Sequence, residues 1–240
     1  MYDRLVITAD VHLPPGDSEK TTRFLDFINS NARECEAIII LGDLFEYWVG
    51  HKQALQNDYQ GVLQALRQTA GFCKLYFMPG NRDYLFSRKT AKACGMEIMP
   101  DPKVVQLSEQ RIFLTHGDLL CLGDVNYLRY RKFIQHPCTK IITRLLPLGI
   151  LLKIAQLLRE RGKRQMNQKS PGEMDITPAA AQKVFADGAD VLICGHVHKP
   201  RQEHVEIQNR TCQLLVLGNW DGPAKFVQYA NGQFSLGEWS

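Results

Sequence analysis

The sequence lacks any closely spaced pair of cysteines. Its seven cysteines are odd in number, lie far apart along the chain and never form a Cys-x-x-Cys pair. This absence argues against a disulfide framework and against a zinc knuckle, because both are built from such pairs. We therefore expect reduced and mostly buried thiols at Cys35, Cys73, Cys94, Cys121, Cys138, Cys194 and Cys212.

The N-terminus and the chain as a whole also lack targeting and low-complexity features. Residues 1–10 contain no basic segment followed by an apolar one, so we expect no secretory signal and take the cytosol as the default compartment. Internal repeats and low-complexity linkers are missing as well. A chain of 240 residues, 45% hydrophobic and 22% charged, fits one large globular domain or one domain with an insertion.

Acidic residues are almost missing from one segment. Residues 125–172 contain one acid, Glu160, and eleven of the 29 Lys and Arg, so the remaining 18 bases face 24 acids. The whole net charge of +4 therefore comes from this segment. Such asymmetry indicates an anionic partner, which could be nucleic acid, phospholipid headgroups or a phosphorylated ligand.

The same segment lacks an uninterrupted apolar run. Residues 141–158 have about the length of a membrane span, but Arg144, Pro147, Gly149 and Lys153 interrupt them. A charge at the bilayer centre costs about 3 kcal/mol or more, which argues against a span. After the Pro-Leu-Gly break, the apolar positions 150, 151, 154, 157 and 158 form a helical stripe beside bases. This pattern is typical of an interfacial helix, and an ordinary core helix is the alternative.

Elsewhere, short apolar runs alternate with helical patterns. Apolar runs predict strands at 5–10, 37–43, 74–81, 111–118, 191–198 and 212–219, and helical spacing predicts helices at 21–34 and about 54–70. Two strand-like runs around an Asn-Gly pair predict a hairpin over 224–239. This order predicts an α/β fold with helices covering sheets. We expect a body of residues 1–124 and 173–240 and a helical cap inserted at 125–172.

Polar side chains follow the predicted strands. Ligands of open α/β sheets gather beyond the carboxyl ends of strands, so these side chains should converge. Their types suit Mn, Fe or Zn rather than Ca or a plain Mg site, and seven donors suit two ions that share a bridge, with Asp43 as the natural bridging carboxylate. Residues two apart in extended backbone face the same way, which pairs Asp10 with His12 and His196 with His198. The seven are Asp10, His12, Asp43, Asn81, His116, His196 and His198.

The glycines at 42, 80, 117 and 195 let the backbone turn sharply beside these residues. A single Asp or His at a strand end is more often a turn residue than a ligand, but five such elements in order make chance a poor explanation. The other histidines, His51, His136 and His204, are expected to be surface or cap residues.

The order D-x-H … GD … GN … HGD … GHxH resembles the calcineurin-like metallophosphoesterases over essentially the whole chain outside the insertion. The resemblance implies a four-layer α-β-β-α sandwich and two divalent ions, commonly manganese, that activate water for in-line attack on phosphorus. It also implies two ligand sets, namely Asp10, His12, Asp43 and His198 for one ion, and Asp43, Asn81, His116 and His196 for the other.

One departure from that family narrows the substrate. Most members read GNH, where the His can protonate a leaving alkoxide, but this chain reads GNRD. Arg82 does not lose its proton in proteins, so it suits binding a second phosphate instead of acting as a general acid. The leaving group should therefore be a phosphate, as in a pyrophosphate. This argues against phosphomonoesters and against a nuclease.

The GD-x-x-E-x-W stretch around Glu46 and Trp48, together with GNRD and the basic insertion, resembles the branch of the family that hydrolyses UDP-2,3-diacylglucosamine in lipid A biosynthesis. The resemblance implies 2,3-diacylglucosamine 1-phosphate and UMP as products and a monomeric peripheral protein at the cytoplasmic face of the bacterial inner membrane, with residues about 138–164 on the membrane and no nucleic-acid partner. Taken singly, Trp48 could simply pack the core and Glu46 could buttress a loop.

The resemblance also implies substrate contacts, at Asn81, Arg82, Asp124, Lys169 and His196. Where relatives commonly place Ser and Asn, this chain has Gly162 and Met166, so those two side-chain roles are not expected here. Two other readings stay open. One is a nuclease or dinucleoside polyphosphate hydrolase whose basic cap binds nucleic acid. The other is a non-catalytic scaffold at a membrane surface.

Overall fold

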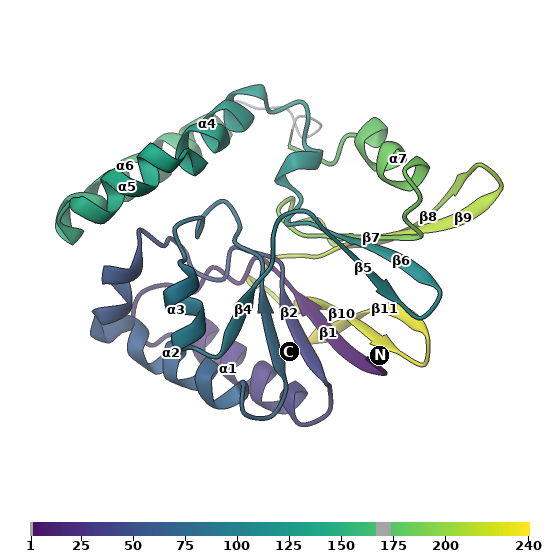
Figure 1. Ribbon diagram of the computed structural model, residues 1–240, viewed down its shortest axis with the longest axis horizontal. Helices are drawn as coiled ribbons and strands as arrows, with labels where there is room; N and C mark the ends of the chain where they lie inside the picture. Colours follow the sequence, from purple (N-terminus) through teal and green to yellow (C-terminus); the bar gives the residue numbers. More distant parts are fainter. Residues whose placement is uncertain (1, 167–173) are drawn as a thin grey trace.

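The computed structural model describes residues 2–166 and 174–240. Two β-sheets lie face to face, and helices cover the outer face of each (Figure 1). The predicted four-layer α-β-β-α sandwich is confirmed.

The first sheet has six strands in the order β11-β10-β1-β2-β3-β4. Strands β1 (Arg4–Thr8), β2 (Ala37–Ile40), β3 (Lys74–Phe77) and β4 (Met96–Ile98) are parallel. The antiparallel strands β10 (Ala224–Ala230) and β11 (Gln233–Trp239) form the predicted C-terminal hairpin. Asn231 and Gly232 both have positive φ there, as a two-residue turn of the type I′ class requires.

The second sheet has five strands in the order β5-β6-β7-β9-β8. Strands β6 (Gln110–Leu114), β7 (Val191–Cys194) and β9 (Arg210–Val216) are parallel neighbours, and β5 (Lys103–Leu107) and β8 (Arg201–Ile207) are antiparallel edge strands. The apolar runs do not predict β4, β5 or β8. The last two are mostly exposed, so no continuous run marks them.

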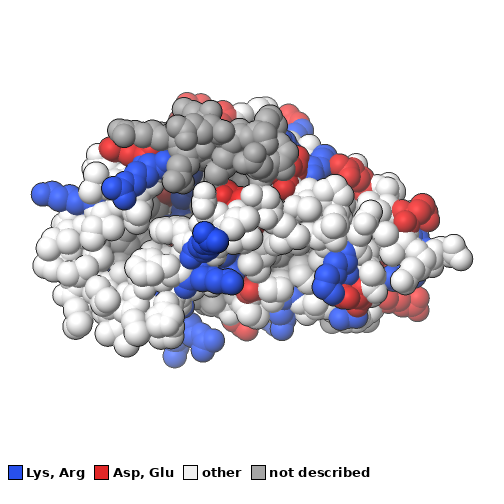
Figure 2. Space-filling view, turned by 90° about the horizontal axis from the view of Figure 1, so that it is seen from above, with Lys and Arg blue, Asp and Glu red and all other residues white. Residues whose placement is uncertain are grey.

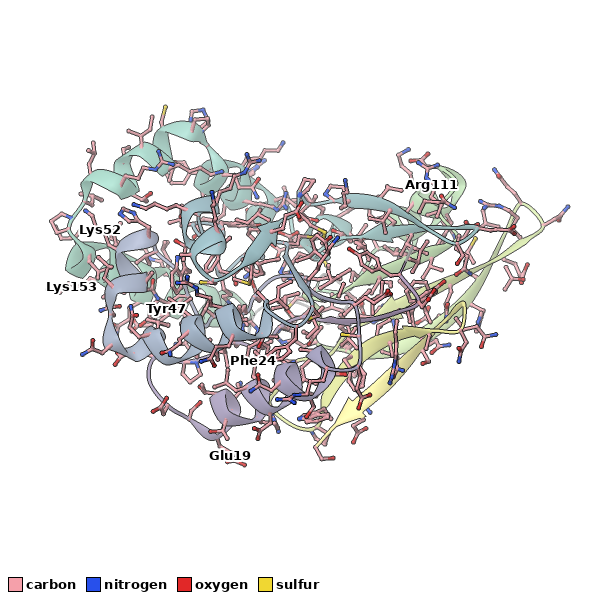
Figure 3. All side chains as sticks on the ribbon, turned by 60° about the horizontal axis from the view of Figure 1, so that its bottom comes forward. Glu19, Phe24, Tyr47, Lys52, Arg111 and Lys153 are labelled. Atoms are coloured by element: carbon pink, nitrogen blue, oxygen red, sulfur yellow. The ribbon has the colours of Figure 1, made fainter. Side chains whose placement is uncertain are left out.

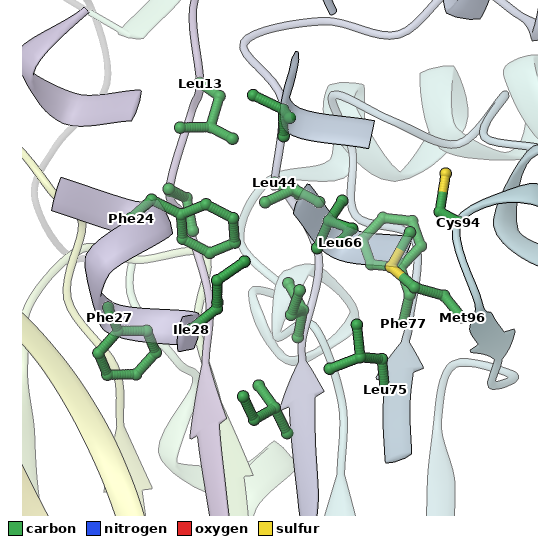
Figure 4. Close-up of a cluster of buried hydrophobic side chains, with 14 of the residues drawn as sticks. Leu13, Phe24, Phe27, Ile28, Leu44, Leu66, Leu75, Phe77, Cys94 and Met96 are labelled. Carbon is green, nitrogen blue, oxygen red and sulfur yellow. The ribbon is translucent and has the colours of Figure 1, made fainter. Parts of the chain in front are cut away.

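The helical layers follow from the spacing of apolar side chains. Helices α1 (Glu19–Ala32), α2 (Asn57–Thr69) and α3 (Arg88–Ala93) cover the six-stranded sheet, and α7 (Pro178–Ala186) covers the five-stranded one. In α1, Phe24, Phe27 and Ile28 turn inward and join side chains of the strands and of α2 in one cluster (Figure 4). Two 3₁₀ turns, η1 (His51–Leu55) and η2 (Asp118–Leu120), complete the body.

A second cluster fills the space between the two sheets. The central strands are buried on both faces, which is why they read as continuous apolar runs. The cluster includes Leu5, Ile7, Ile39, Leu114, Ile193 and Leu215.

Helices α4 (Val125–Gln135), α5 (Pro137–Leu145) and α6 (Leu148–Met166) come between β6 and β7 in the sequence and lie apart from the sheets (Figure 1). The predicted break at Pro147 separates α5 from α6. The predicted stripe of α6 is divided, because Leu151 is buried whereas Ile150, Ile154 and Leu157 are exposed. None of the helices that the structure describes combines the length and hydropathy needed to cross a membrane.

Candidate metal centre and phosphoester site

All seven predicted polar residues converge at the carboxyl edge of the parallel strands. Three of them form a first group on one side, Asp10, His12 and His198, whose ligand atoms lie within 4.8 Å of one another. The Nε2 atoms of His12 and His198 are 3.1 Å apart, and Nε2 of His198 is 3.6 Å from Oδ1 of Asp10. Three donors at this spacing can hold one divalent ion.

The second group surrounds the amide oxygen of Asn81. This Oδ1 atom is 2.9 Å from Nε2 of His116 and 2.9 Å from Nδ1 of His196. Asp43 lies between the two groups, because its Oδ1 is 3.7 Å from His116 and its Oδ2 is 4.0 Å from Nδ1 of His12. A carboxylate in this position can serve two ions at once.

The backbone at these residues differs from the prediction. Strand β1 ends at Thr8 and β7 at Cys194, so the residues that follow lie in loops rather than in extended strands. The left-handed backbone of these loops, and not the two-residue period of a strand, turns the side chains toward one point. Positive φ angles between 53° and 71° occur at Asp10, His12, Asp43, His196 and His198.

Two of the predicted glycines serve close approach rather than a sharp turn. A side chain at Gly80 would overlap Oδ1 of Asp43, and one at Gly195 would overlap Oδ2 of Asp10. Gly42 and Gly117 do have positive φ, as predicted. Glycine therefore keeps the backbone in contact with both carboxylates.

Burial and mutual charge shift the titration of the cluster. Burial lowers the pKa of His12 to about 3 and that of His196 to about 4. Burial raises the pKa of Asp43 to about 7. Burial also lowers the pKa of His116, but the carboxylates of Asp43, Asp118 and Asp10 outweigh it and raise that pKa to about 9. Burial and neighbouring charges thus move the pKa values of the cluster away from their usual range.

The donor set fits divalent cations. Oδ1 of Asp10 and Nδ1 of His12 are buried and have no hydrogen-bond partner among the described residues. Buried polar atoms are normally paired, so atoms left open and directed at carboxylates and imidazoles suit a cation. The chain therefore has Asp and His groups that can bind metal.

Asp83 supports both ligand loops, although only its place in the GNRD motif marks it in the sequence. Its buried carboxylate accepts hydrogen bonds from the backbone N–H groups of Gly80 at 2.7 Å and Leu44 at 2.8 Å. The loop with Asp43 and the loop with Asn81 are thereby joined.

Arg82 lies beside this cluster, and its side chain is 28% exposed. Its backbone N–H donates to Oδ1 of Asp43 at 2.8 Å, and its Nη1 donates to Oε1 of Glu46 at 3.3 Å. The same carboxylate oxygen is 2.6 Å from Nη2 of Arg159 in α6, a residue that no motif marked. Glu46 therefore does more than buttress a loop, since it pairs with one cation of the body and one of the helical segment.

Trp48 packs in the hydrophobic core, which is one of the two roles considered for it from the sequence. It is 2% exposed and contacts the rings of Phe45, Tyr59 and Phe86. The predicted surface or cap positions of the three remaining histidines are confirmed. His51 and His204 are exposed, and His136 caps α5. All seven cysteines are free, and Cys138 is the exposed one.

Of the two remaining predicted substrate contacts, the structure describes Asp124 but not Lys169. Asp124 is the N-cap of α4, where its side chain accepts from the backbone N–H of Tyr127 at 3.1 Å. Lys169 lies outside the described residues. Gly162 belongs to α6, and Met166 ends that helix.

The surface of α5 and α6 combines apolar side chains and bases. Figure 2, seen from the side of these helices, shows broad uncharged areas with Lys and Arg among them. In Figure 3, Lys52 of η1 and Lys153 of α6 lie at the same end of the molecule, and Nζ of Lys52 donates to the carbonyl of Leu146 at 3.0 Å. The exposed apolar residues here are Ile141, Ile142, Leu145, Ile150, Ile154 and Leu157.

The fold and this cluster define a phosphoesterase of the dimetal class. A sequence profile described as calcineurin-like phosphoesterase matches residues 3–200, and the chain belongs to that family. It is 36% identical over 234 residues to the UDP-2,3-diacylglucosamine hydrolase of Pseudomonas savastanoi pv. phaseolicola, which covers 97% of this chain and 94% of that protein.

Two further relatives carry the same name. The protein from Pseudomonas entomophila is 36% identical over 234 residues, 97% of each chain, and that from Pseudomonas aeruginosa PAO1 is 35% identical over 219 residues, 90% of this chain and 91% of the relative. The branch that the GD-x-x-E-x-W and GNRD motifs indicated is confirmed.

Proposed function

We propose that this protein hydrolyses the pyrophosphate bond of UDP-2,3-diacylglucosamine to 2,3-diacylglucosamine 1-phosphate and UMP, as a step of lipid A biosynthesis. The observation that carries the proposal is Arg82, a fixed cation beside the metal-binding cluster where relatives that expel an alkoxide need a titratable acid. Relatives at 34–36% identity with the matching name support the same substrate.

Two divalent ions, most consistent with Mn²⁺, are assigned to the site. Asp10, His12, Asp43 and His198 would hold one ion, and Asp43, Asn81, His116 and His196 would hold the other. When bound, such a pair lowers the pKa of water and neutralises charge on phosphoryl oxygens. The mixed set of imidazoles, carboxylates and one amide, together with the open atoms of Asp10 and His12, supports this assignment.

The residues of this chain orient the diphosphate. Arg82 would bind the phosphate that departs, so that no proton has to be delivered to it. Asn81 and His196 would meet the attacked phosphate, and Asp124 and Lys169 would hold the UDP-sugar. Residues 125–172 act in this proposal as a cap over the body of residues 1–124 and 173–240.

The cap also provides a membrane contact in this proposal. The exposed apolar residues of α5 and α6 lie among exposed bases such as Lys140, Arg144 and Lys153. Apolar side chains with bases around them suit the boundary of an anionic bilayer. A monomer bound peripherally at the cytoplasmic face of the inner membrane would reach its lipid substrate in this way.

The activity test uses purified protein, MnCl₂ and UDP-2,3-diacylglucosamine in detergent micelles. We expect Mn-dependent release of UMP, followed by chromatography, with diadenosine tetraphosphate and single-stranded DNA left intact. Asp43→Ala and His116→Ala should abolish turnover, whereas His204→Ala, an exposed histidine of β8, should retain it. Release of UDP instead of UMP, or hydrolysis of the soluble compounds alone, would overturn the proposed substrate.

The membrane contact is tested separately by sedimentation with phosphatidylglycerol vesicles. Ile142→Asp with Leu145→Asp should reduce the bound fraction and leave turnover of micellar substrate intact. A matched control is Phe72→Asp, because Phe72 is 64% exposed and lies outside the cap. Equal sedimentation of the double variant and the wild type would refute the contact.

A further inference from the structure

A buried arginine joins helix α4 to the loop that carries His116. Arg131 is 8% exposed although it is a charged residue of a surface helix. Its Nε donates to Oδ2 of Asp118 at 2.6 Å, and its Nη2 donates to Oδ2 of Asp101 at 2.6 Å. A guanidinium held by two buried carboxylates fixes the helix at one point and in one orientation.

Both carboxylates belong to the immediate support of His116. The other oxygen of Asp101 accepts from Oγ1 of Thr115 at 2.7 Å and from the backbone N–H of His116 at 3.2 Å. Asp118 follows His116 by two residues and begins η2. Through Asp101, Arg131 is linked to Thr115 and to the backbone of His116, and through its ion pair with Asp118 it is linked to the residue two positions after His116. It does not contact the imidazole ring of His116 itself.

Two tyrosines close the network on the side of the other histidine. The hydroxyl groups of Tyr84 and Tyr127 are 2.8 Å apart, and Tyr84 donates to Oδ2 of Asp118 at 2.6 Å. The ring of Tyr127, which belongs to α4, lies 5.6 Å from the ring of His196. The placement of α4 is therefore connected to both histidines that surround Asn81.

We propose that Arg131 is a positioning residue for the ion held by Asn81, His116 and His196, and that it makes this half of the centre depend on the docking of α4. This inference rests on the proposed dimetal site. Among the described residues, Asp10, His12 and His198 make no hydrogen bond to Arg131, Asp101 or Asp118, so the first group should respond less. Substituting a residue that orients a metal ligand typically lowers the metal affinity or the activity by about 10- to 100-fold.

The experiment compares Arg131→Met, Arg131→Lys and the control Arg129→Met, whose exposed arginine lies on the same helix. Mn²⁺ is titrated into each metal-free protein by calorimetry, and bound Mn²⁺ is counted by electron paramagnetic resonance. Hydrogen exchange of the His116 backbone N–H is measured on the metal-free proteins. Steady-state kcat and KM are measured with the lipid nucleotide.

For Arg131→Met we expect one Mn²⁺ to bind about tenfold more weakly and the other as in the wild type, with faster exchange at His116. Its kcat should fall about 10- to 100-fold while KM changes little. Arg131→Lys should restore part of both effects, because an ammonium keeps the charge but not the fork. Arg129→Met should match the wild type.

A folded Arg131→Met protein with wild-type Mn²⁺ binding, exchange and kcat would overturn the inference. A lower melting temperature with those three values unchanged would also overturn it, since it would show a purely structural role. If Arg131→Met does not fold, Arg131→Lys and Thr115→Val, which removes one bond to Asp101, decide the question by the same measurements. A wild type that binds Mn²⁺ but releases no UMP contradicts the proposed function alone.

Discussion

Oε1 of Glu46 accepts a hydrogen bond from Nη1 of Arg82 at 3.3 Å, and the same oxygen is 2.6 Å from Nη2 of Arg159. The backbone of Arg82 is fixed independently, because its N–H donates to Asp43 and its carbonyl accepts from the N–H of Trp48 at 2.8 Å. The guanidinium of Arg82 is therefore held beside the cluster, where the proposed function places the departing phosphate.

Arg82→Lys should lower kcat about 10- to 100-fold. A lysine keeps the positive charge but loses the planar pair of donors, and a hydrogen bond to a charged group contributes about 1.5–3 kcal/mol. Initial rates of UMP release at saturating substrate measure the change. Lys183→Arg, an exposed lysine of α7, serves as the control and should leave kcat unchanged. A lysine variant as fast as the wild type would remove Arg82 from the reaction.

How far the sequence predicts this site depends on what each residue does. The side chains that carry chemistry, such as Asp43 and His116, follow apolar strands in motifs that can be read directly. Arg131 and Arg159 cannot be found in this way, because each sits in a basic helix among many similar residues. Only the packing of α4 and α6 against the body decides which of these bases are buried or paired.

The affinity for Mn²⁺ should rise with pH between about 6 and 9. In the metal-free protein the pKa of Asp43 is raised to about 7 and that of His116 to about 9, so Asp43 loses its proton in the lower part of this range and His116 in the upper part. Metal binding requires the deprotonated forms and releases these protons, which tightens binding up to about tenfold per pH unit for each proton displaced. His12 and His196 are already neutral, since their pKa values are lowered to about 3 and 4.

Calorimetric titrations at pH 6.5 and 8.5 measure this dependence. Repeating each titration in buffers of different ionisation enthalpy counts the protons released. Equal affinity at both pH values would contradict the assignment of Asp43 and His116 to the ions.

Gly80→Ala should abolish metal binding and turnover. Its new methyl group would overlap Oδ1 of Asp43 and approach Cε1 of His116 to 2.8 Å, so the carboxylate between the two groups has to move. Gly149→Ala is the matched control, because open space surrounds Gly149 within α6 and alanine favours a helix by about 0.5–1 kcal/mol. Bound Mn²⁺ per protein separates the two variants. A Gly80→Ala protein with two bound ions would contradict the close packing.

The strands of the fold also differ in how well the sequence predicts them. Central strands such as β2 and β7 are buried on both faces, so their apolar runs predict them. The edge strand β8 has alternating and mostly exposed side chains, and its pairing with β9 defines it. Five of the seven ligand residues have left-handed backbone in loops instead of the extended strands that the apolar runs predict, and no apolar pattern reveals such loops.

Trp48→Ala should destabilise the protein by about 3–5 kcal/mol with a smaller effect on the rate per folded molecule. The indole is fully packed against Phe45, Tyr59 and Phe86, and its removal leaves a cavity that these rings cannot fill completely. Urea unfolding measures the free energy of unfolding, and kcat is measured on the folded fraction. Phe72→Ala, an exposed aromatic residue, should stay within about 0.5 kcal/mol of the wild type. Unchanged stability with a lost rate would instead assign Trp48 to the substrate, so this pair of measurements decides between its two readings.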